Sequence, residues 1–251
     1  MPDMIFLSII NHNHDHLIVA NTTLPLIAQS NPVIIKSNTP ASDALKNFAT
    51  RYKITLLDCD YGLGFGENNN YVFQYLVNNN LITDADYFLV INPDVVIESH
   101  EFKKLDDAIK TYKSDIFTIN LFHDQYYTKP ELSVRRFPKL TGPLKGLLSK
   151  ESRSDAYDKK SITQPLEVDW AAGSFLLFKK SAYEILGGFD TKYFMYFEDV
   201  DICRRAKKME MPLMYLPNIQ AIHKGAFNNR KLYSRHFRWY LISYLTYHFL
   251  S

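Results

Sequence analysis

Short apolar runs alternate with helical stretches along residues 5–119, and this alternation constrains the fold more than any other feature. The runs are rich in β-forming residues and cover 5–10, 32–35, 54–57, 87–91 and 116–119. The segments between them space their apolar residues as helices do. Strands that alternate with helices predict parallel βαβ units, with helices covering both faces of one sheet. We therefore expect an α/β fold, and 251 residues suit one large domain of this class or two small ones.

The pattern fails after Asn120. Residues 123–165 contain four prolines, two glycines and many charges, which is typical of an irregular insertion or a mobile lid. Order returns at Val168, with a predicted strand at 174–178 and a terminal helix from about Asn229. A single domain would then consist of a half at 1–120, a second half at 166–228 and a C-terminal amphipathic helix at 229–251.

The net charge of +2 is unevenly distributed. Residues 201–251 hold nine Lys and Arg against two acidic residues, a net charge of +7, so the first 200 residues carry −5. The near-neutral total argues against a nucleic-acid binder, and two cysteines are too few for a disulfide scaffold. The start of the chain lacks a basic segment, and the run 5–10 is too short for a signal peptide, so we expect a cytoplasmic protein.

Two acidic motifs are candidates for chemistry. Asp94 follows the strand 87–91, where open α/β sheets bind ligands, and a carboxylate there can hold Mg²⁺ against a phosphate. An Asx-Pro turn explains the same residues equally well. The cluster EDVD at 198–201 follows an aromatic segment, which desolvates carboxylates and raises their pKa toward the range of a general base. The alternative is an ordinary helix start, with the acids at the positive end of the helix dipole and Arg204 and Arg205 one turn further on.

Three further features are ambiguous on their own. The segment WAAGS at 170–174 offers small residues, which let either a substrate or another element approach the backbone. The glycines of 62–66 lack the spacing of a dinucleotide-binding turn, which excludes an NAD site and leaves a loop against a ligand. His223 is an ordinary structural histidine unless it reaches the same cation as Asp94.

In their order along the chain, these motifs resemble the family 2 inverting glycosyltransferases with the GT-A fold, and within them the bacterial rhamnosyltransferase-like group. The matching segments are an apolar first strand ending in NHN at 11–13, a glycine- and asparagine-rich stretch at 62–70, NPDV at 92–95, WAAGS, GGFD at 187–190 and FMYFEDVDICRR at 194–205. They span nearly the whole chain. The resemblance implies a Rossmann-like nucleotide-binding sheet with helices on both faces, in a single GT-A domain with a C-terminal helix.

The resemblance also implies roles for individual residues. Asp94 and His223 would hold Mg²⁺ or Mn²⁺ against the diphosphate of a nucleotide-sugar donor, where the cation stabilises the leaving group. Asp199 would act as the catalytic base on the acceptor hydroxyl, with Glu198 beside it. Substrate contacts are expected at the remaining matched positions: Asn11, Asn38, Gly62, Asn69, Trp170, Gly173 and Asp201.

Two positions depart from the family pattern. Where relatives carry an acid that meets the nucleobase, this chain has KSNT at 36–39, so Asn38 would have to replace that contact through its amide. In the metal motif, Asn92 stands where many relatives have a carboxylate. One carboxylate fewer predicts weaker cation binding, and full activity of EDTA-treated enzyme without added metal would contradict any use of a cation.

The C-terminal segment carries one aromatic stripe. Its members recur at helical spacing beside a basic row, the stripe being Tyr233, Phe237, Tyr240, Tyr244 and Tyr247 and the row Lys231, Arg235 and Arg238. In one interpretation the stripe packs on the sheet or on a second subunit, as in a homodimer. In the other, it makes a peripheral contact with the inner membrane, where the basic row meets anionic headgroups or a polyprenyl-diphosphate acceptor.

These features lead to one functional hypothesis: transfer of one sugar, with inversion, from a nucleotide-sugar donor to a lipid-linked glycan or a growing surface polysaccharide. The resemblance favours L-rhamnose from dTDP-L-rhamnose, with UDP-galactose or UDP-GlcNAc as alternatives. A nucleotidyltransferase would need a basic glycine-rich loop after the first strand, which residues 11–16 lack. In a non-catalytic sugar-binding module, the third alternative, Asp199→Asn would have no turnover to change.

Overall fold

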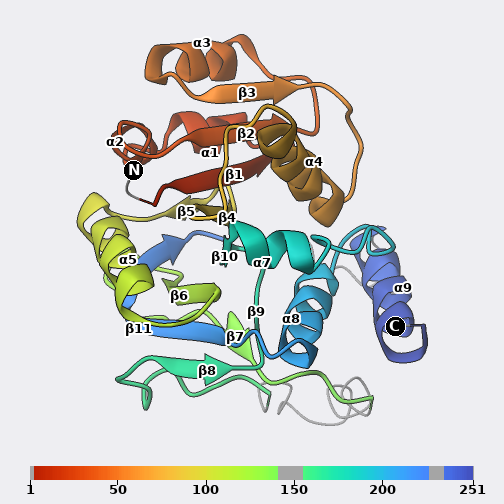
Figure 1. Ribbon diagram of the computed structural model, residues 1–251. Helices are drawn as coiled ribbons and strands as arrows, with labels where there is room; N and C mark the ends of the chain where they lie inside the picture. The colour runs from red at the N-terminus through yellow and green to blue at the C-terminus, as the bar shows by residue number, and fades with distance from the viewer. Residues whose placement is uncertain (1–2, 141–154, 226–234, 251) are drawn as a thin grey trace.

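A mixed β-sheet with helices on both faces forms the centre of the computed structural model, which describes residues 3–140, 155–225 and 235–250 (Figure 1). Within these ranges the sheet has nine strands: β1 (Ile5–Asn11), β2 (Val33–Ser37), β3 (Thr55–Asp58), β4 (Tyr87–Ile91), β5 (Val95–Val96), β6 (Ile116–Phe122), β8 (Leu166–Val168), β10 (Phe175–Lys179) and β11 (Leu213–His223). A second, two-stranded sheet pairs β7 (Val134–Arg135) with β9 (Trp170–Ala171). The helices are α1 (Asp15–Val19), α2 (Leu24–Ile27), α3 (Asp43–Tyr52), α4 (Phe65–Asn78), α5 (Ser99–Thr111), α7 (Lys180–Ile185), α8 (Glu198–Lys208) and α9 (Arg235–Phe249).

The strands of the N-terminal part are parallel, as the alternating pattern predicts. In the order β3-β2-β1-β4 each strand pairs in parallel with its neighbours. The next strand, β10, comes from the second half of the chain and is antiparallel to both β4 and β6, between which it lies. A short apolar run carries no sign of its direction, and β10 enters the sheet only after the long excursion that follows β6.

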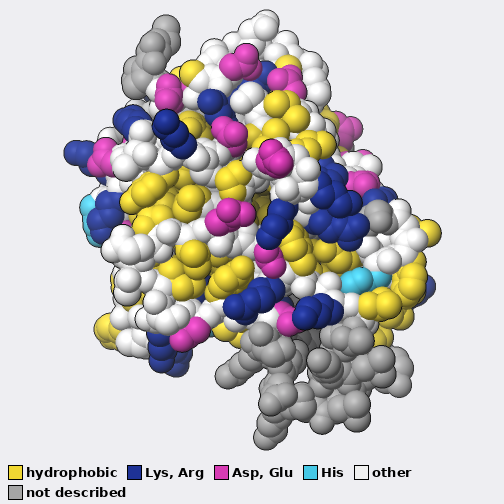
Figure 2. All heavy atoms as spheres, turned by 60° about the horizontal axis from the view of Figure 1, so that its bottom comes forward, with side chains coloured by type: hydrophobic (Ala, Val, Ile, Leu, Met, Phe, Trp, Pro, Cys, Tyr) yellow, Lys and Arg dark blue, Asp and Glu magenta, His cyan; other side chains and the backbone are white. Residues whose placement is uncertain are grey.

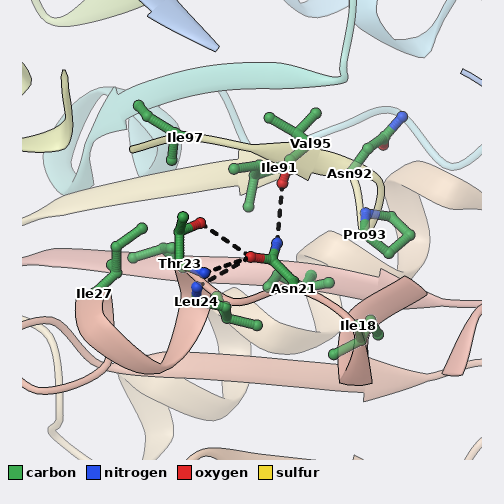
Figure 3. Close-up of a pocket in the computed structure, with 12 residues that line it drawn as sticks. Ile18, Asn21, Thr23, Leu24, Ile27, Ile91, Asn92, Pro93, Val95 and Ile97 are labelled. Carbon is green, nitrogen blue, oxygen red and sulfur yellow. Dashed lines mark hydrogen bonds between the residues drawn. The ribbon is translucent and has the colours of Figure 1, made fainter. Parts of the chain in front are cut away.

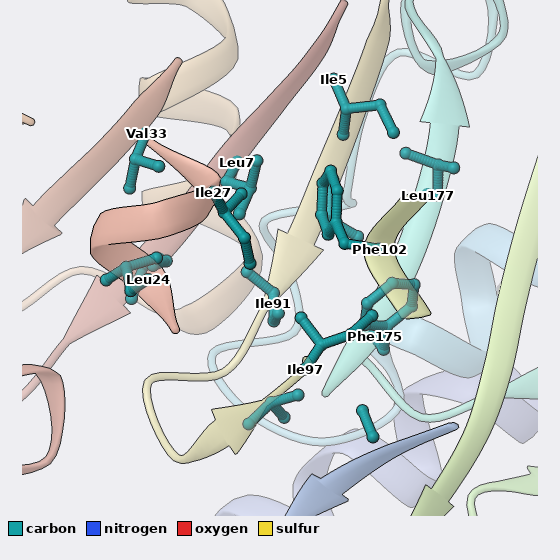
Figure 4. Close-up of a cluster of buried hydrophobic side chains, with 14 of the residues drawn as sticks. Ile5, Leu7, Leu24, Ile27, Val33, Ile91, Ile97, Phe102, Phe175 and Leu177 are labelled. Carbon is teal, nitrogen blue, oxygen red and sulfur yellow. The ribbon is translucent and has the colours of Figure 1, made fainter. Parts of the chain in front are cut away.

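Two hydrophobic clusters cover the two faces of the sheet. Successive residues of β1 point to opposite faces, so Ile5 and Leu7 join one cluster and Phe6 joins the other. The first cluster contains buried residues of α1, α2, α3 and α5, and Figure 4 shows Ile27 of α2 pointing toward Leu7 and Ile91. The second contains buried residues of α4, α7 and α8. The predicted arrangement, with helices on both faces, is confirmed.

Helix boundaries follow local capping. The segment between the runs 5–10 and 32–35, expected to be helical, is divided into α1 and α2. The side chain of Asn21 accepts hydrogen bonds from the N–H groups of Thr23 and Leu24 and so begins a new helix, α2. Ser42 caps α3 through its hydroxyl, which accepts from Leu45 N. The glycine-rich turn opens α4 as expected.

The aromatic stripe of the C-terminal helix is only half covered. Tyr244 and Tyr247 are buried against Tyr193, Phe197 and Val200, which lie in and just before α8. The N-terminal half of α9 exposes apolar side chains, including Phe237 and Tyr240 (44% and 42% exposed). The stripe therefore packs on α8 rather than on the sheet, while its Tyr233 and the neighbouring Lys231 fall outside the described residues. No helix in the described part of the chain is long and apolar enough to cross a membrane.

Candidate active site

The acidic pair Glu198-Asp199 lies at the first turn of α8, after a sharp change in backbone direction. Tyr196 and Phe197 both have left-handed backbone angles (φ 71° and 67°), which are unfavourable for residues with bulky side chains. Such strain is maintained only where the surroundings fix it, and here the buried rings of Tyr193 and Phe197 do so. The turn presents the two carboxyl groups at the start of a helix, where its dipole favours a negative charge.

The two carboxyl groups have different environments. Asp199 is partly exposed and accepts hydrogen bonds from Gly173 N (3.1 Å) and Val200 N (2.8 Å). Glu198 is buried, and its Oε2 has no hydrogen-bond partner among the described residues. Burial raises the pKa of both groups; the charge of Asp199 raises that of Glu198 further, whereas the backbone donors and Arg135 oppose the rise at Asp199. Glu198 therefore holds its proton more strongly, and Asp199 is the carboxyl of the pair that ionises more readily.

Glycines bring the loop before α4 against the acidic pair. A Cβ on Gly64 would lie 2.6 Å from Phe194 O, and one on Gly66 2.6 Å from Phe189 Cβ, so any other residue would push these segments apart. A Cβ on Gly173 would lie 3.0 Å from the ring of Phe65 and 3.7 Å from Asp199 Cβ. These glycines serve close packing around the acids, the alternative that the sequence left open for Gly173. Gly62, also a predicted contact residue, has open space around it and a left-handed backbone (φ 81°).

A second group of polar side chains gathers at the end of β4. His223 Nε2 lies 3.2 Å from Asp94 Oδ1, and both side chains are 12% exposed. The register of β11 on β5 places them together, because His223 pairs with Val95. The amide nitrogen of Asn92 lies 3.4 Å from the same His223 Nε2. The structure thus brings together the two residues predicted to bind a metal.

A hydrogen bond from Asn21 stabilises this turn. Asn21 donates to Val95 O (3.2 Å) and connects the start of α2 to the segment after Asp94, as Figure 3 shows. The small pocket around Asn21 is lined mainly by aliphatic side chains and by no charged residue, so it belongs to the packing of the turn rather than to a substrate site.

The charges at this turn favour a cation. Burial disfavours a protonated His223, yet the hydrogen bonds that its ring donates to Asp94 and Glu131 outweigh burial and raise its pKa to about 10. A cation bound at Nε2 would replace the proton there. Burial also acts against ionised Asp94, but His223 lowers the pKa of this carboxyl below its ordinary value. Carboxylate oxygen and imidazole nitrogen are both ligands for divalent ions, so the pair fits the expected Mg²⁺ or Mn²⁺. The described residues hold no cluster of three or more acidic, His or Cys side chains arranged for a metal.

One dipeptide connects the two groups. Gly173 donates its N–H to Asp199, and the carbonyl of the next residue, Ser174, accepts from Asn92 N at 3.1 Å. Beyond it, Phe175 of β10 pairs with Ile91 of β4. The acidic pair and the Asp94–His223 pair therefore lie at the same end of the sheet, joined through its backbone.

The asparagines predicted to bind substrate are engaged within the protein. Asn11 donates to Asp15 and Ser37 and accepts from His14 N; Asn38 forms reciprocal bonds with the backbone of Leu63; Asn69 accepts from Ser8 and donates to Phe65 O. All three are buried. They hold strand ends and the glycine-rich loop in place, and direct contact with a substrate stays a prediction.

Lys36 explains the departure from the family pattern at 36–39. Its side chain is fully buried and donates to the carbonyls of Ser37, Cys59 and Asp60. In place of an acid that meets a nucleobase, this chain has a lysine that fastens the turn after β3.

Two further predicted contact residues have structural partners. Asp201 is buried and bonded to Arg205 (2.7 Å), whose guanidinium also donates to the carbonyls of Leu186 and Gly188. This is the helix pair that the sequence offered as the alternative to function. Trp170 is half-buried, donates to Arg136 O, and lies under the guanidinium of Arg135 at 5.9 Å from the ring centroid.

Sequence reasoning missed two residues at this site, and both lie in the irregular segment after β6. The charge of Arg135 acts to lower the pKa of Asp199. The Nε of Arg135 is buried without a hydrogen-bond partner in the described part of the chain. Glu131 lies 2.9 Å from His223 Nδ1. No motif marks either residue, because the segment has no periodicity and β7 pairs with a strand more than thirty residues away. His14 is half-buried, and the charge of Asp94 acts on it.

Known proteins with similar sequences are glycosyltransferases. The chain is 32% identical to "Rhamnosyltransferase WbbL" of Escherichia coli K12 over 247 residues, which cover 97% of this chain and 92% of that protein. It is 30% identical over 220 residues to the "N-acetylglucosaminyl-diphospho-decaprenol L-rhamnosyltransferase" of Mycobacterium tuberculosis, covering 80% of this chain and 69% of the relative. No protein-family model matches the chain.

Solved structures agree on the fold. The structure of GalNAc-T7 with UDP, GalNAc and Mn²⁺ superposes with a TM-score of 0.60 at 13% identity, over 88% of this chain and 43% of that one. Staphylococcus aureus TarS 1–349 gives a TM-score of 0.58 at 10% identity, over 87% and 60%. At sequence identities this low, the two superpositions indicate a shared fold and nothing more. Taken with the relatives that match along nearly its whole length, the chain belongs to the rhamnosyltransferase-like group of the family 2 glycosyltransferases with the GT-A fold.

Proposed function

We infer that this glycosyltransferase moves L-rhamnose, with inversion, from dTDP-L-rhamnose to a sugar carried on a polyprenyl diphosphate. The chemistry rests on one observation: the carboxyl group of Asp199, which accepts from Gly173 N, is joined through Gly173 and Ser174 to the Asp94–His223 pair. A base near a cation-binding pair is the arrangement needed to activate a hydroxyl on one side of a sugar and release a diphosphate on the other. The sugar and the lipid carrier come from the names of the relatives.

Each residue has a distinct part in this reaction. Asp199 takes the proton of the acceptor hydroxyl as its oxygen attacks the anomeric carbon. Burial and the charge of Asp199 raise the pKa of Glu198, so Asp199 is the carboxyl that loses its proton more readily. Asp94 and His223 would hold Mg²⁺ or Mn²⁺, which neutralises charge on the departing diphosphate. Arg135, over the face of Trp170, adds a positive charge near the base and is placed to attract an anionic substrate.

The test is a transfer assay with purified enzyme, Mn²⁺ and an N-acetylglucosaminyl-diphospho-lipid acceptor, followed by mass spectrometry. The expected product gains one rhamnose from dTDP-L-rhamnose, and Asp199→Asn abolishes the gain. Thermal shift with dTDP, UDP or GDP, with and without Mn²⁺, measures donor preference separately, because stabilisation follows affinity. Transfer from a UDP-sugar but not from dTDP-L-rhamnose would overturn the donor; no shift with any nucleotide would overturn the transferase site.

A lipid acceptor requires contact with a membrane, and α9 is the segment suited to it. Within Arg235–Phe249 there is no acidic residue, and the exposed apolar side chains include Leu241, Ile242 and Leu245. Figure 2, which brings forward the lower side of Figure 1, shows basic and hydrophobic side chains close together on this side of the molecule. Apolar residues with a basic flank favour the interface of an anionic bilayer.

Flotation with liposomes that contain anionic lipid tests this contact. The enzyme is expected to float, and the double variant Ile242→Ser, Leu245→Ser to stay at the bottom, while its thermal stability and nucleotide binding remain unchanged. Wild-type enzyme that stays at the bottom would refute the contact without affecting the assignment of the active site.

A further inference from the structure

His223 lies between two carboxylates, and the cation site accounts for only one of them. Its Nε2 faces Asp94 (3.2 Å), whereas its Nδ1 lies 2.9 Å from Glu131 Oε2. The two ring nitrogens point in opposite directions, so Glu131 cannot share a cation held between Asp94 and Nε2. All three side chains are largely withdrawn from water, with exposures of 12%, 12% and 15%.

We propose that Glu131 is a positioning residue for the bound cation: it accepts the Nδ1–H of His223 and holds the ring with Nε2 turned toward Asp94. A metal-binding histidine usually donates its second N–H to a carboxylate, which fixes the tautomer and the orientation of the ring. The inference rests on the cation-dependent function proposed above. Glu131 lies in the irregular segment after β6, which carries no recognisable motif.

The backbone places Glu131 beside His223 independently of their side chains. Glu131 N donates to Leu121 O at 2.9 Å, and Pro130 forms a bridge with Phe122, so the chain returns along the end of β6. On the other side of β6, Phe122 pairs with Ile222 of β11, the residue before His223. Glu131 and His223 are thus set next to each other by two neighbouring strand pairings.

The loop between β6 and Glu131 is fastened internally. Asp124 accepts hydrogen bonds from the N–H groups of Tyr126, Thr128 and Lys129, the last at 2.6 Å. The ring of Tyr127 contacts that of Phe122 with centroids 5.3 Å apart. A loop with this many local bonds presents Glu131 from a defined position, as a group that must orient a metal ligand requires.

A purely structural pair would use the same contact differently. If Glu131 only tied the loop to β11, its loss would lower stability and leave cation affinity unchanged. If it orients His223, its loss lowers cation affinity even in protein that remains fully folded, and the loss depends on the presence of His223.

The decisive measurement is Mn²⁺ binding in the presence of saturating dTDP, with free Mn²⁺ followed by electron paramagnetic resonance and no turnover required. Glu131→Ala is expected to weaken Mn²⁺ binding by about 10- to 100-fold, the usual effect of removing such a partner. Glu131→Gln, whose amide oxygen still accepts from Nδ1, is expected to lose less. Asp158→Asn is the matched control, because Asp158 is an exposed carboxylate that lines the same surface pocket as Glu131 and has no contact with His223.

A double-mutant cycle completes the test. In a His223→Ala background, Glu131→Ala is expected to change Mn²⁺ affinity no further, because the residue acts only through the ring. Wild-type affinity in both Glu131 variants, with Asp94→Asn abolishing binding, overturns this inference and leaves the proposed function intact. Absence of Mn²⁺ binding in the wild type would remove the cation from the proposed function, and this inference with it. Thermal unfolding without cation identifies any variant that fails to fold, and Glu131→Gln then carries the result.

Discussion

Replacing each carboxyl of the acidic pair by its amide should separate the catalytic base from its neighbour. Asp199 receives two backbone N–H donors and the field of Arg135, whereas Glu198 is buried with one oxygen unpartnered. Asp199→Asn therefore removes the carboxyl that ionises more readily, whereas Glu198→Gln replaces the one that holds its proton more strongly. The two variants have nearly the same shape as the wild type, so differences between them report charge.

The expected magnitudes differ by orders of magnitude. A general base contributes typically about 10²- to 10⁴-fold to a rate, or roughly 3–5 kcal/mol at 1.36 kcal/mol per tenfold, and Asp199→Asn should lose this from kcat. Glu198→Gln leaves an amide where an acid already lacked a partner, so its kcat should stay within about fivefold of wild type, roughly 1 kcal/mol.

The assay is steady-state transfer from dTDP-L-rhamnose at saturating acceptor, with dTDP affinity measured in parallel by thermal shift. Both variants should bind Mn²⁺ and dTDP as the wild type does, because neither acid belongs to the Asp94–His223 pair. The reasoning fails if Glu198→Gln loses as much activity as Asp199→Asn, since Glu198 would then be the base. It fails equally if Asp199→Asn retains more than a tenth of the wild-type rate.

Three predictions concern stability. Native Glu198 keeps its proton to higher pH than Glu198 in the unfolded chain, so the free energy of unfolding of the wild type falls as pH rises above about 4.5. Relative to the wild type, the free energy of unfolding of Glu198→Gln should therefore increase from pH 5 to 8, as measured by urea unfolding. Burial lowers the pKa of Lys159 to about 8 from 10.5. Between these pH values the free energy of unfolding of the wild type should rise by up to about 3 kcal/mol relative to that of Lys159→Met. Equal pH dependence of the two proteins would refute this prediction. Arg205→Lys cannot keep the bonds to Asp201 and two carbonyls, and should lower the free energy of unfolding by about 3 kcal/mol in the same titration.

The order of elements was predictable because periodicity is a local property. Runs such as 87–91 and 116–119 are apolar on both faces, which only a covered sheet explains, and the structure buries both. The antiparallel direction of β10 was not predictable, because the residues of a strand do not indicate which strands it will pair with or in which direction. The division of the first helical stretch depended on the side chain of Asn21, a capping signal that spacing alone does not weigh.

The chemistry of the site was predictable in part, for a different reason. Motif order pointed to Asp94, His223 and Asp199, and the structure brings these side chains to one end of the sheet. Motif order could not separate residues that face a substrate from those that hold the scaffold. Asn38 and Asp201 have their groups bonded within the protein, a fact that depends on three-dimensional partners.

The charge of the last fifty residues is likewise divided between two uses. Some of its basic groups stabilise the fold: Arg205 binds Asp201, Lys207 binds Asp169 at 2.6 Å, and Arg204 lies over the ring of Tyr247. The described part of α9 adds Arg235 and Arg238 without any acid. The asymmetry seen in the sequence is therefore partly offset by contacts within the molecule, and two of the other basic groups, Arg235 and Arg238, lie on the helix proposed to meet the membrane.

The site depends on one stretch of backbone for its geometry. Gly173 binds Asp199 and Ser174 binds Asn92, so the base and the cation-binding turn hold to adjacent peptide groups. The next residues form β10, whose side chains from Phe175 to Phe178 are fully buried between β4 and β6. A base on a helix and a cation site on a turn would drift apart if each were anchored separately. Because both are anchored to the start of a buried strand at the centre of the sheet, the backbone of this strand sets the separation between the proposed base and the proposed cation site.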